Sequence, residues 1–448
     1  MALLTRAEAE ALLKKVLALS KADELEASLG GGRSANTRFG VNSANTSGDR
    51  DDLALVVNAH FGQRGGVATT NTLDDAGLEK VVRAAEAIAR LSPENPEQQP
   101  FLGKQEYGEI AFAFDEATYK ADAAQRARGI ASTIDPARSK NLIAAGLYDH
   151  EGGFTAVANT RGNFGYARSS RATFTTTVRT ADGTGSGWGS AMSHRISDIN
   201  AQSVGAYAIR KAELSRNPVA IEPGNYTVIL EPNAIGDLVA NMLFFFGARQ
   251  ADEGRSFLSK KGGGNRLGEK IFGEGINVYT DPNFASAPGL PFDGEGLPTR
   301  RIDFIKNGVV KNLNYSRFWA KKQGKEAMPS PTNLIMEGGT SSIEDMIKAT
   351  DRGVLVTRLW YIRLVDPQTV LYTGLTRDGT FLIENGRLKS AVKNFRFNES
   401  PVKILNNVDL MSPVTRITGS ERVGDRLPIL APAVKVRDFS FTSLSEAV

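Results

Sequence analysis

The segment Ile305-Lys306-Asn307-Gly308-Val309-Val310-Lys311 is the strongest fold signal in this 448-residue chain. Asn-Gly between alternating apolar residues is typical of a β-hairpin, because both central residues must adopt positive φ. A second copy with similar flanks follows at Ile383-Glu384-Asn385-Gly386-Arg387-Leu388-Lys389. The two turns hint at a duplicated sheet unit. They predict a β-rich domain over residues 220–448, with a sheet curled towards a barrel or a sandwich.

The start of this domain contains one strand and one helix. Pro218 and Pro223-Gly224 mark the boundary, and Tyr226 to Leu230 has the pattern of a strand. A helix is predicted from about Asn233 to Phe246. It is apolar nearly all round, so we expect it to be buried.

The N-terminal residues predict a compact unit over residues 1–97. Thr5-Arg6-Ala7-Glu8 fits a capping box that opens a helix, which should end near Ser20. A second amphipathic helix is expected after Asp74-Asp75, stopped by Ser92-Pro93. Between the helices, period-two patterns predict strands joined as hairpins, at residues 24–29, 34–41, 53–61 and 67–70, with Gly30, Gly31 and Gly32 separating the first two.

A second unit, over residues 105–216, repeats this layout. A helix is predicted from about Asp115 to Thr133, strands between Leu142 and His194, and a helix from about Asp198 to Ser215. No sequence repeat between the two units is visible. The predicted fold class is therefore α+β: helix and hairpin units with mixed or antiparallel sheets, followed by the β-rich domain.

Composition excludes several kinds of chemistry. The chain has no cysteine and only three histidines, His60, His150 and His194, far apart in sequence. Disulfides, thiolate nucleophiles and sulfur-ligated zinc are therefore excluded. The 54 Lys and Arg residues balance 50 Asp and Glu without a basic run of five, which argues against nucleic-acid binding.

The sequence pattern predicts neither a signal peptide nor a membrane helix. Lys14 and Lys15 interrupt what would be the apolar region of a signal peptide. The longest apolar stretch, Leu238 to Gly247, is shorter than the roughly 20 residues that a membrane helix needs. We expect a cytoplasmic protein that does not bind membranes.

Familiar catalytic motifs are incomplete. His150-Glu151 is followed by Gly152-Gly153 without a second histidine, so a structural turn is favoured over a zinc-binding helix. The glycine-rich segment 260–266 does not complete a phosphate-binding loop and is interpreted as a solvated loop. No Gly-x-Ser-x-Gly elbow for a serine hydrolase occurs.

Two segments carry candidate binding residues. Asp293-Gly294-Glu295-Gly296 places two carboxylates in one turn, where they could hold a cation or a peptide amine, although turns favour Asp and Gly for backbone reasons alone. Residues 356–363 alternate as a strand, with Thr357, Leu359, Tyr361 and Arg363 on one face and Arg358, Trp360 and Ile362 on the other. Either the second face contacts an extended peptide or a partner chain, or it packs in the core with a snorkelling arginine.

Several motifs in family order carry a resemblance. Residues 291–300, Pro291-Phe292-Asp293-Gly294-Glu295-Gly296-Leu297-Pro298-Thr299-Arg300, resemble the "DDEG-x-P-T" element of the TldD/PmbA family. Residues 305–309 are similar to its "I-x-N-G-V-L" element, and residues 373–386, which include Arg377, to its "G-x-x-x-x-x-G-x-x-I-E-N-G" element. The likeness runs over most of the chain, beginning with Arg38-Phe39 and residues 64–68.

The resemblance implies a subunit of a peptidase complex. In the TldD branch, a His-Glu-x-x-x-His helix after a strand and a later cysteine hold zinc. The equivalent segment here is Ala240-Asn241-Met242-Leu243-Phe244-Phe245, which is apolar where ligands should be. This departure resembles the TldE/PmbA branch. It implies a chain without catalytic or metal-ligating residues, paired with a TldD-like partner that carries the zinc.

The sequence favours one hypothesis for the function of this chain and leaves two alternatives open. The leading hypothesis is the non-catalytic half of a cytosolic metallopeptidase complex that acts on unfolded or short peptides. Alternatives are a stand-alone homodimeric peptide-binding protein and a modulator of DNA gyrase or another nucleic-acid protein. Candidate residues for binding substrate or partner are Asp293, Glu295, Arg358, Trp360 and Arg377.

Overall fold

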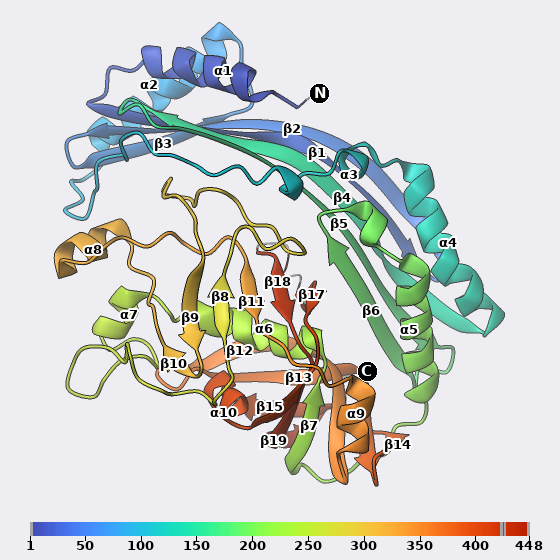
Figure 1. Cartoon of the computed structure of the whole chain (residues 1–448). Coiled ribbons are helices and arrows are strands. Elements are labelled where there is room, and N and C mark those ends of the chain that lie inside the picture. The colour runs from blue at the N-terminus through green and yellow to red at the C-terminus, as the bar shows by residue number, and fades with distance from the viewer. Residues whose placement is uncertain (1–2, 422–423, 425–426, 446–448) are drawn as a thin grey trace.

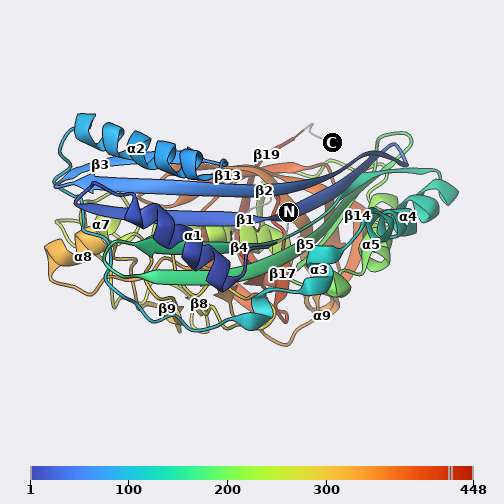
Figure 2. The ribbon, with the colours of Figure 1, turned by 90° about the horizontal axis from the view of Figure 1, so that it is seen from above.

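The computed structural model describes residues 3–421, 424 and 427–445. The fold is α+β, as predicted, and has two parts (Figure 1). A long, curved sheet from the N-terminal half arches over a β-rich C-terminal part. Seen from above, the long strands run side by side across the top of that part (Figure 2).

The N-terminal part is built on one six-stranded antiparallel sheet, which both predicted N-terminal units share through the pairing of β1 with β4. Its order is β3-β2-β1-β4-β5-β6. The strands are β1 (Glu24–Gly40), β2 (Ser43–Phe61), β3 (Arg64–Thr70), β4 (Leu142–Asn159), β5 (Phe164–Thr180) and β6 (Ser186–Ser193).

The helices of this part begin at polar caps. Thr5 forms the predicted capping box with Glu8, and Asp74 caps the second helix. The helix predicted from Asp115 to Thr133 is instead two helices, because the chain extends at Ala121 and Asp122 caps a new start. The helices are α1 (Arg6–Ala18), α2 (Asp75–Leu91), α3 (Glu116–Lys120), α4 (Ala123–Ser139) and α5 (Ala201–Leu214), with 3-10 turns at Ala111–Ala113 and Ile196–Asp198.

One face of the sheet packs on helices and the other faces the C-terminal part. Alternate residues of a strand point to opposite faces. In β4, Phe154 and Ala156 lie in the apolar core that also includes residues of α1 and α2, whereas Val157 packs with Phe292 of the C-terminal part. In β1, Leu25 and Phe39 point to the same face of the sheet. Leu25 lies in the core with α1 and α2 at one end, and Phe39 lies in the core with α4 and α5 at the other. Two helix pairs therefore cover opposite ends of one face.

The two halves of the sheet repeat the same packing. In the last strand of the first unit, a Cβ on Gly66 would lie 2.2 Å from the backbone nitrogen of Ala89 in α2. In the last strand of the second unit, a Cβ on Gly187 would lie 2.2 Å from the backbone oxygen of Ala208 in α5. In both units the closing helix therefore lies directly on strand backbone, which requires glycine. This repetition supports the predicted common layout.

The prediction that Gly30, Gly31 and Gly32 separate two strands is wrong. β1 runs through all three glycines as one 17-residue strand. A Cβ on Gly32 would lie 2.4 Å from the backbone oxygen of Gly152 in β4, so the glycines permit close approach in the middle of the sheet.

The C-terminal part contains a closed five-stranded barrel, one of the two forms predicted. The strands follow the order β12-β7-β19-β15-β13, and pairing of β12 with β13 closes the ring. They are β7 (Gly224–Leu230), β12 (Arg352–Asp366), β13 (Leu371–Glu384), β15 (Phe395–Glu399) and β19 (Val434–Leu444), with β14 (Arg387–Ala391) and β16 (Val408–Met411) attached.

A second sheet stands beside the barrel, with helix α6 (Pro232–Leu243) between them. Its order is β10-β9-β8-β11-β18-β17. The strands are β8 (Val278–Thr280), β9 (Ile302–Lys306), β10 (Val309–Val310), β11 (Leu334–Met336), β17 (Thr415–Ile417) and β18 (Ile429–Ala431). Short helices complete this part: α7 (Ala248–Asp252), α8 (Arg317–Gln323), α9 (Ile343–Lys348) and α10 (Pro401–Asn406).

Both Asn-Gly hairpins are confirmed. Asn307 and Gly308 have φ of 49° and 75°, and Asn385 and Gly386 have φ of 51° and 73°. The first turn joins β9 to β10 in the second sheet, and the other joins β13 to β14 on the barrel. The two turns therefore belong to different sheets. No helix of the described residues is long and apolar enough to cross a membrane.

Candidate functional site

Helix α6 organises the region where the barrel, the second sheet and the N-terminal sheet meet. Asn233 and Asp237 lie one turn apart on it, and both bind the segment after β17. The Asn233 Oδ1 accepts from the backbone nitrogen of Gly419 at 3.1 Å, and Asp237 Oδ2 accepts from that of Ser420 at 2.8 Å. Thr418 in the same segment contacts Ser190 of β6 through their hydroxyls at 2.9 Å. This segment therefore connects α6 to the edge of the large sheet.

Asp237 is a buried acid that sequence reasoning missed. Its side chain is almost fully buried, and burial raises its pKa to about 7, against the opposing effects of Ser420 and Arg358. It is the one charged residue of a mostly apolar helix whose other polar side chains are two asparagines, and that contrast could have identified it. A carboxyl that titrates near neutral pH is a common feature of functional sites.

The C-terminal half of α6 does not fit a zinc ion. Ala240, Asn241 and Phe245 occupy the segment in which the resemblance places the ligands of the TldD branch. Zinc needs imidazole, thiolate or carboxylate donors. The Asn241 amide instead donates to the Asp237 carbonyl at 2.8 Å. Nowhere in the part of the chain that the structure describes do three His, Asp or Glu side chains gather as a metal site.

An apolar cavity of about 420 Å³ lies beside this half of the helix. Phe244, which is 62% exposed, stands at its wall, and Gln250 and Asn314 supply polar atoms. Concave, mostly apolar sites with a few polar groups are typical of ligand binding. The remaining apolar lining comes from Ala240, Leu243, Phe246, Phe304, Pro331, Leu427 and Ile429.

Three of the five predicted binding residues come together at the junction between the barrel and the large sheet. Arg358 in β12 lies opposite Arg377 in β13, and Asp378 binds Arg358 through Nε at 2.8 Å. The Arg358 guanidinium lies 4.5 Å from the ring centre of Trp188 in β6 and 5.2 Å from that of Trp360. Arg358 is 8% exposed, so the core-packing alternative describes it better than contact with a free peptide.

The predicted alternation along this strand is only partly correct. Thr357 and Leu359 are buried, but the β12–β13 register shifts on both sides of Arg358 to Trp360. Tyr361 adopts a φ of 55° and is 55% exposed, so it does not share a buried face with Leu359. A β-bulge reverses which side chains face the core, and the alternating sequence does not reveal it.

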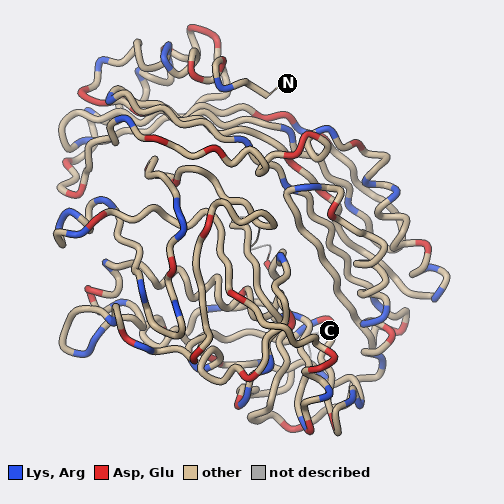
Figure 3. The backbone as a smooth tube through the Cα atoms, viewed as in Figure 1, with Lys and Arg blue, Asp and Glu red and all other residues tan. Residues whose placement is uncertain are grey.

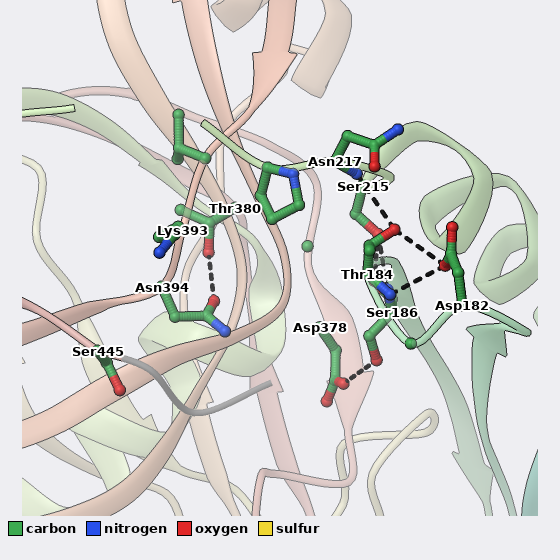
Figure 4. Close-up of a pocket in the computed structure, with 14 residues that line it drawn as sticks. Asp182, Thr184, Ser186, Ser215, Asn217, Asp378, Thr380, Lys393, Asn394 and Ser445 are labelled. Atoms are coloured by element: carbon green, nitrogen blue, oxygen red, sulfur yellow. Dashed lines mark hydrogen bonds between the residues drawn. The ribbon is translucent and has the colours of Figure 1, made fainter. Parts of the chain in front are cut away.

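A cavity of about 380 Å³ opens next to this cluster (Figure 4). Asp378 and Ser186 meet at its edge, with the Ser186 hydroxyl donating to Asp378 Oδ1 at 2.5 Å. Asp378 therefore accepts bonds from both parts of the molecule. Its contacts are Arg358, the more distant Arg377 at 3.8 Å and Ser186, so we interpret this carboxylate as a structural joint.

The other two predicted residues, Asp293 and Glu295, lie elsewhere. Asp293 Oδ1 accepts from the backbone nitrogens of Glu295 and Leu297, and Oδ2 accepts from that of Ser330 at 2.7 Å. The Asp293 carboxylate therefore organises its own turn, the alternative noted from the sequence. Glu295 remains exposed beside Arg317 at a separate cavity of about 300 Å³.

The interpretation of His150-Glu151 as a turn is wrong. Both residues lie inside β4, and His150 is buried against Arg126, with its Nε2 2.8 Å from Arg126 Nη1. Burial and the neighbouring arginines lower the pKa of His150 to about 4. The glycines that suggested a turn lie where β4 passes close to β1.

A buried ion pair between Lys211 and Glu231 joins the N-terminal and C-terminal parts. Lys211 of α5 binds Glu231, the residue before α6, at 2.5 Å and donates to Thr357 Oγ1 at 3.0 Å. Both charged side chains are buried, and the Tyr207 hydroxyl donates to the same carboxylate. Neither residue stood out in the sequence, because the pair forms only when the two parts pack together.

Comparisons with known proteins agree with this architecture. Residues 104–216 match the family model of the PmbA/TldA metallopeptidase central domain, and residues 223–443 match that of its C-terminal domain. The chain belongs to the PmbA/TldD family of metallopeptidase-like proteins.

Individual relatives are distant. An uncharacterized protein of Methanocaldococcus jannaschii is 32% identical over 34% of this chain and 38% of its own length. Metalloprotease PmbA of Escherichia coli O157:H7 is 24% identical over 77% of this chain and 78% of its own. The crystal structure of TldE from Thermococcus kodakarensis superposes with a TM-score of 0.86 at 20% identity, covering 97% of this chain and 99% of that one.

Proposed function

We propose that this chain is the non-catalytic, TldE-like subunit of a cytosolic TldD/TldE-type metallopeptidase complex. A TldD-like partner holds the zinc, and this chain helps to bind unfolded or short peptides.

The donor chemistry of α6 carries the proposal. The side chains of Ala240 in α6 and of Phe245 just after it have no atom that can ligate a metal, and the chain has no cysteine to supply a sulfur ligand. Metal hydrolysis needs an ion held by several donors with one open position. A member of a metallopeptidase family without such donors fits the role of a supporting subunit.

The cavity beside α6 supports a role in peptide binding. Its apolar lining suits an apolar side chain of a peptide, and Gln250 and Asn314 can form hydrogen bonds with the peptide backbone.

The distribution of charge gives no comparable support for nucleic-acid binding. Lys and Arg are interspersed with Asp and Glu over both parts of the molecule (Figure 3).

Reconstitution tests the proposal. The chain, a TldD-like protein from the same organism and their mixture are each assayed with a fluorogenic unfolded protein substrate, with and without a chelator. We expect no activity from the chain alone, co-elution of the two proteins, and chelator-sensitive hydrolysis by the mixture. Failure of the chain to bind the TldD-like protein or to change its activity would refute the proposed complex.

A further inference from the structure

A second cavity, of about 280 Å³, lies between the C-terminal part and the face of the large sheet opposite its helices. Arg416 of β17, His194 at the end of β6 and Ser170 of β5 contribute polar groups to its lining. Pro331 and Leu427 line both this cavity and the apolar cavity beside α6. The two spaces are therefore neighbours with a common wall.

Arg416 is a half-buried arginine, and two nitrogen atoms of its guanidinium lack partners within the residues that the structure describes. Its Nε and Nη1 atoms are inaccessible to solvent and have no hydrogen-bond partner among the described residues. Burial and the nearby charge of Arg171 lower its pKa to about 10, so it remains a cation at neutral pH. Burying part of a cation without a bound anion costs free energy, and the cost falls when an anion enters.

His194 has the same deficit. Its side chain is 4% exposed, and neither ring nitrogen has a partner among the described residues. Burial and the charges of Arg416 and Arg195 lower its pKa to about 4, so at neutral pH the ring is uncharged and has one N–H to donate. His194 and Arg416 together offer several unused donors to the same space.

The acidic residues of the described chain that lie near this cavity are already engaged. Glu151 pairs with Arg171 at 3.1 Å, Asp198 accepts from the Ser193 hydroxyl at 2.7 Å, and Asp115 caps α3. These carboxylates therefore leave Nε and Nη1 of Arg416 without a partner.

We infer that this cavity is a carboxylate-binding subsite in which Arg416 is the principal cation and His194 a second donor. The inference rests on the proposed function and deepens it: the ligand is a peptide with a free C-terminal carboxylate. An apolar side chain of the same peptide occupies the neighbouring cavity beside α6. Arginine suits this task because its planar fork matches a carboxylate.

A small ligand tests the subsite independently of peptide hydrolysis. Thermal unfolding of the full chain is measured with N-acetyl-phenylalanine, with its uncharged amide, and with inorganic phosphate. We expect the acid to raise Tm in a concentration-dependent manner and the amide to have no effect. In Arg416→Met the effect of the acid disappears. It persists in the control Arg437→Met, which alters an exposed arginine paired with Asp409 on the barrel.

The unliganded variant supplies a second readout. Because Nε and Nη1 of Arg416 have no partner in the described part of the chain, Arg416→Met should unfold at a temperature equal to or above that of the unchanged chain, whereas loss of a structural arginine would lower it. Equal effects of the acid and the amide, or a markedly lower Tm of unliganded Arg416→Met, overturn the inference, as does stabilisation by phosphate alone. Peptide binding in the reconstituted complex can still succeed in each of these cases, so the two proposals fail separately.

Discussion

Single buried ionisable residues give this protein a predictable response to pH. Asp237 and His150 are both almost fully buried, but burial acts in opposite directions on an acid and a base. The pKa of Asp237 is raised to about 7 and that of His150 is lowered to about 4. The two residues therefore oppose folding in different pH ranges.

Asp237 should destabilise the protein as the pH rises. Between pH 4 and 7 the folded state keeps the carboxyl proton while the unfolded state loses it, so this contribution falls through that range and is lost above pH 7. This shift in the pKa of Asp237 corresponds to a pH-dependent contribution on the order of 4 kcal/mol to the free energy of unfolding. Urea unfolding at pH 5 and pH 8 should therefore show a smaller pH difference in Asp237→Asn, which keeps the oxygen acceptor for Ser420. An unchanged pH difference would mean that Asp237 does not titrate in this range.

His150 should act at acid pH. The unfolded state takes up a proton below about pH 6.5, whereas the folded state resists until about pH 4, so stability is lost as the pH falls through this window. In His150→Gln, the decline of stability between pH 6.5 and 4.5 should be shallower than in the unchanged chain. Parallel curves for the two proteins would contradict the assignment.

Arg358 and Arg377 both approach Asp378 but should differ in importance. Arg358→Ala leaves a buried carboxylate without its main partner, at a cost of about 3–5 kcal/mol. Arg377 lies 3.8 Å from Asp378 and its side chain is 24% exposed, so Arg377→Ala should cost less than about 1 kcal/mol. Chemical denaturation of both variants measures the difference, and similar losses would show that Arg377 carries more of the joint than its geometry indicates.

At the scale of elements, the glycines under α2 and α5 determine how closely helices approach strands. Gly187→Ala would place a methyl group 2.2 Å from a backbone oxygen of α5, so the helix must move, at a cost of about 1–3 kcal/mol. Gly108→Ala is the matched control, because its Cβ would meet nothing within 4 Å. Thermal unfolding should separate the two variants clearly. An unchanged Tm in Gly187→Ala would show that α5 can shift freely.

The features predicted correctly are those whose sequence signal lies within a few neighbouring residues. The capping box at Thr5, the stop after Leu91 and both Asn-Gly turns are confirmed, since each depends on a few neighbouring residues. The glycines at residues 30–32 were misread because a glycine required by a neighbouring strand looks the same as one required by a turn. The bulge at Tyr361 was missed for a similar reason: it depends on the pairing of β12 with β13.

At the scale of the whole molecule, the candidate site arises between parts that are distant in the sequence. Arg358, Trp360 and Arg377 were candidates for binding substrate or partner, with core packing left open for the strand at residues 356–363. Arg358 is buried against Trp188 of β6, and Arg377 lies over the ring of Trp360. The ion pair between Lys211 and Glu231 forms only when the large sheet packs on the C-terminal part. The same packing brings His194 and Arg416 to the lining of one cavity. No pattern within one segment could reveal such pairs. The residue types at 240–245, the segment to which the resemblance assigns the ligands, can in contrast be read directly from the sequence, and the absence of zinc from this chain stays a prediction.

We propose that this chain cannot hold a catalytic zinc ion by itself, and its metal content is the most direct check. The full chain is purified without a metal-affinity tag, incubated with excess zinc, dialysed and analysed by inductively coupled plasma mass spectrometry. We predict far less than one zinc per chain. One zinc per chain, retained through dialysis and removed only by a chelator, would contradict the account.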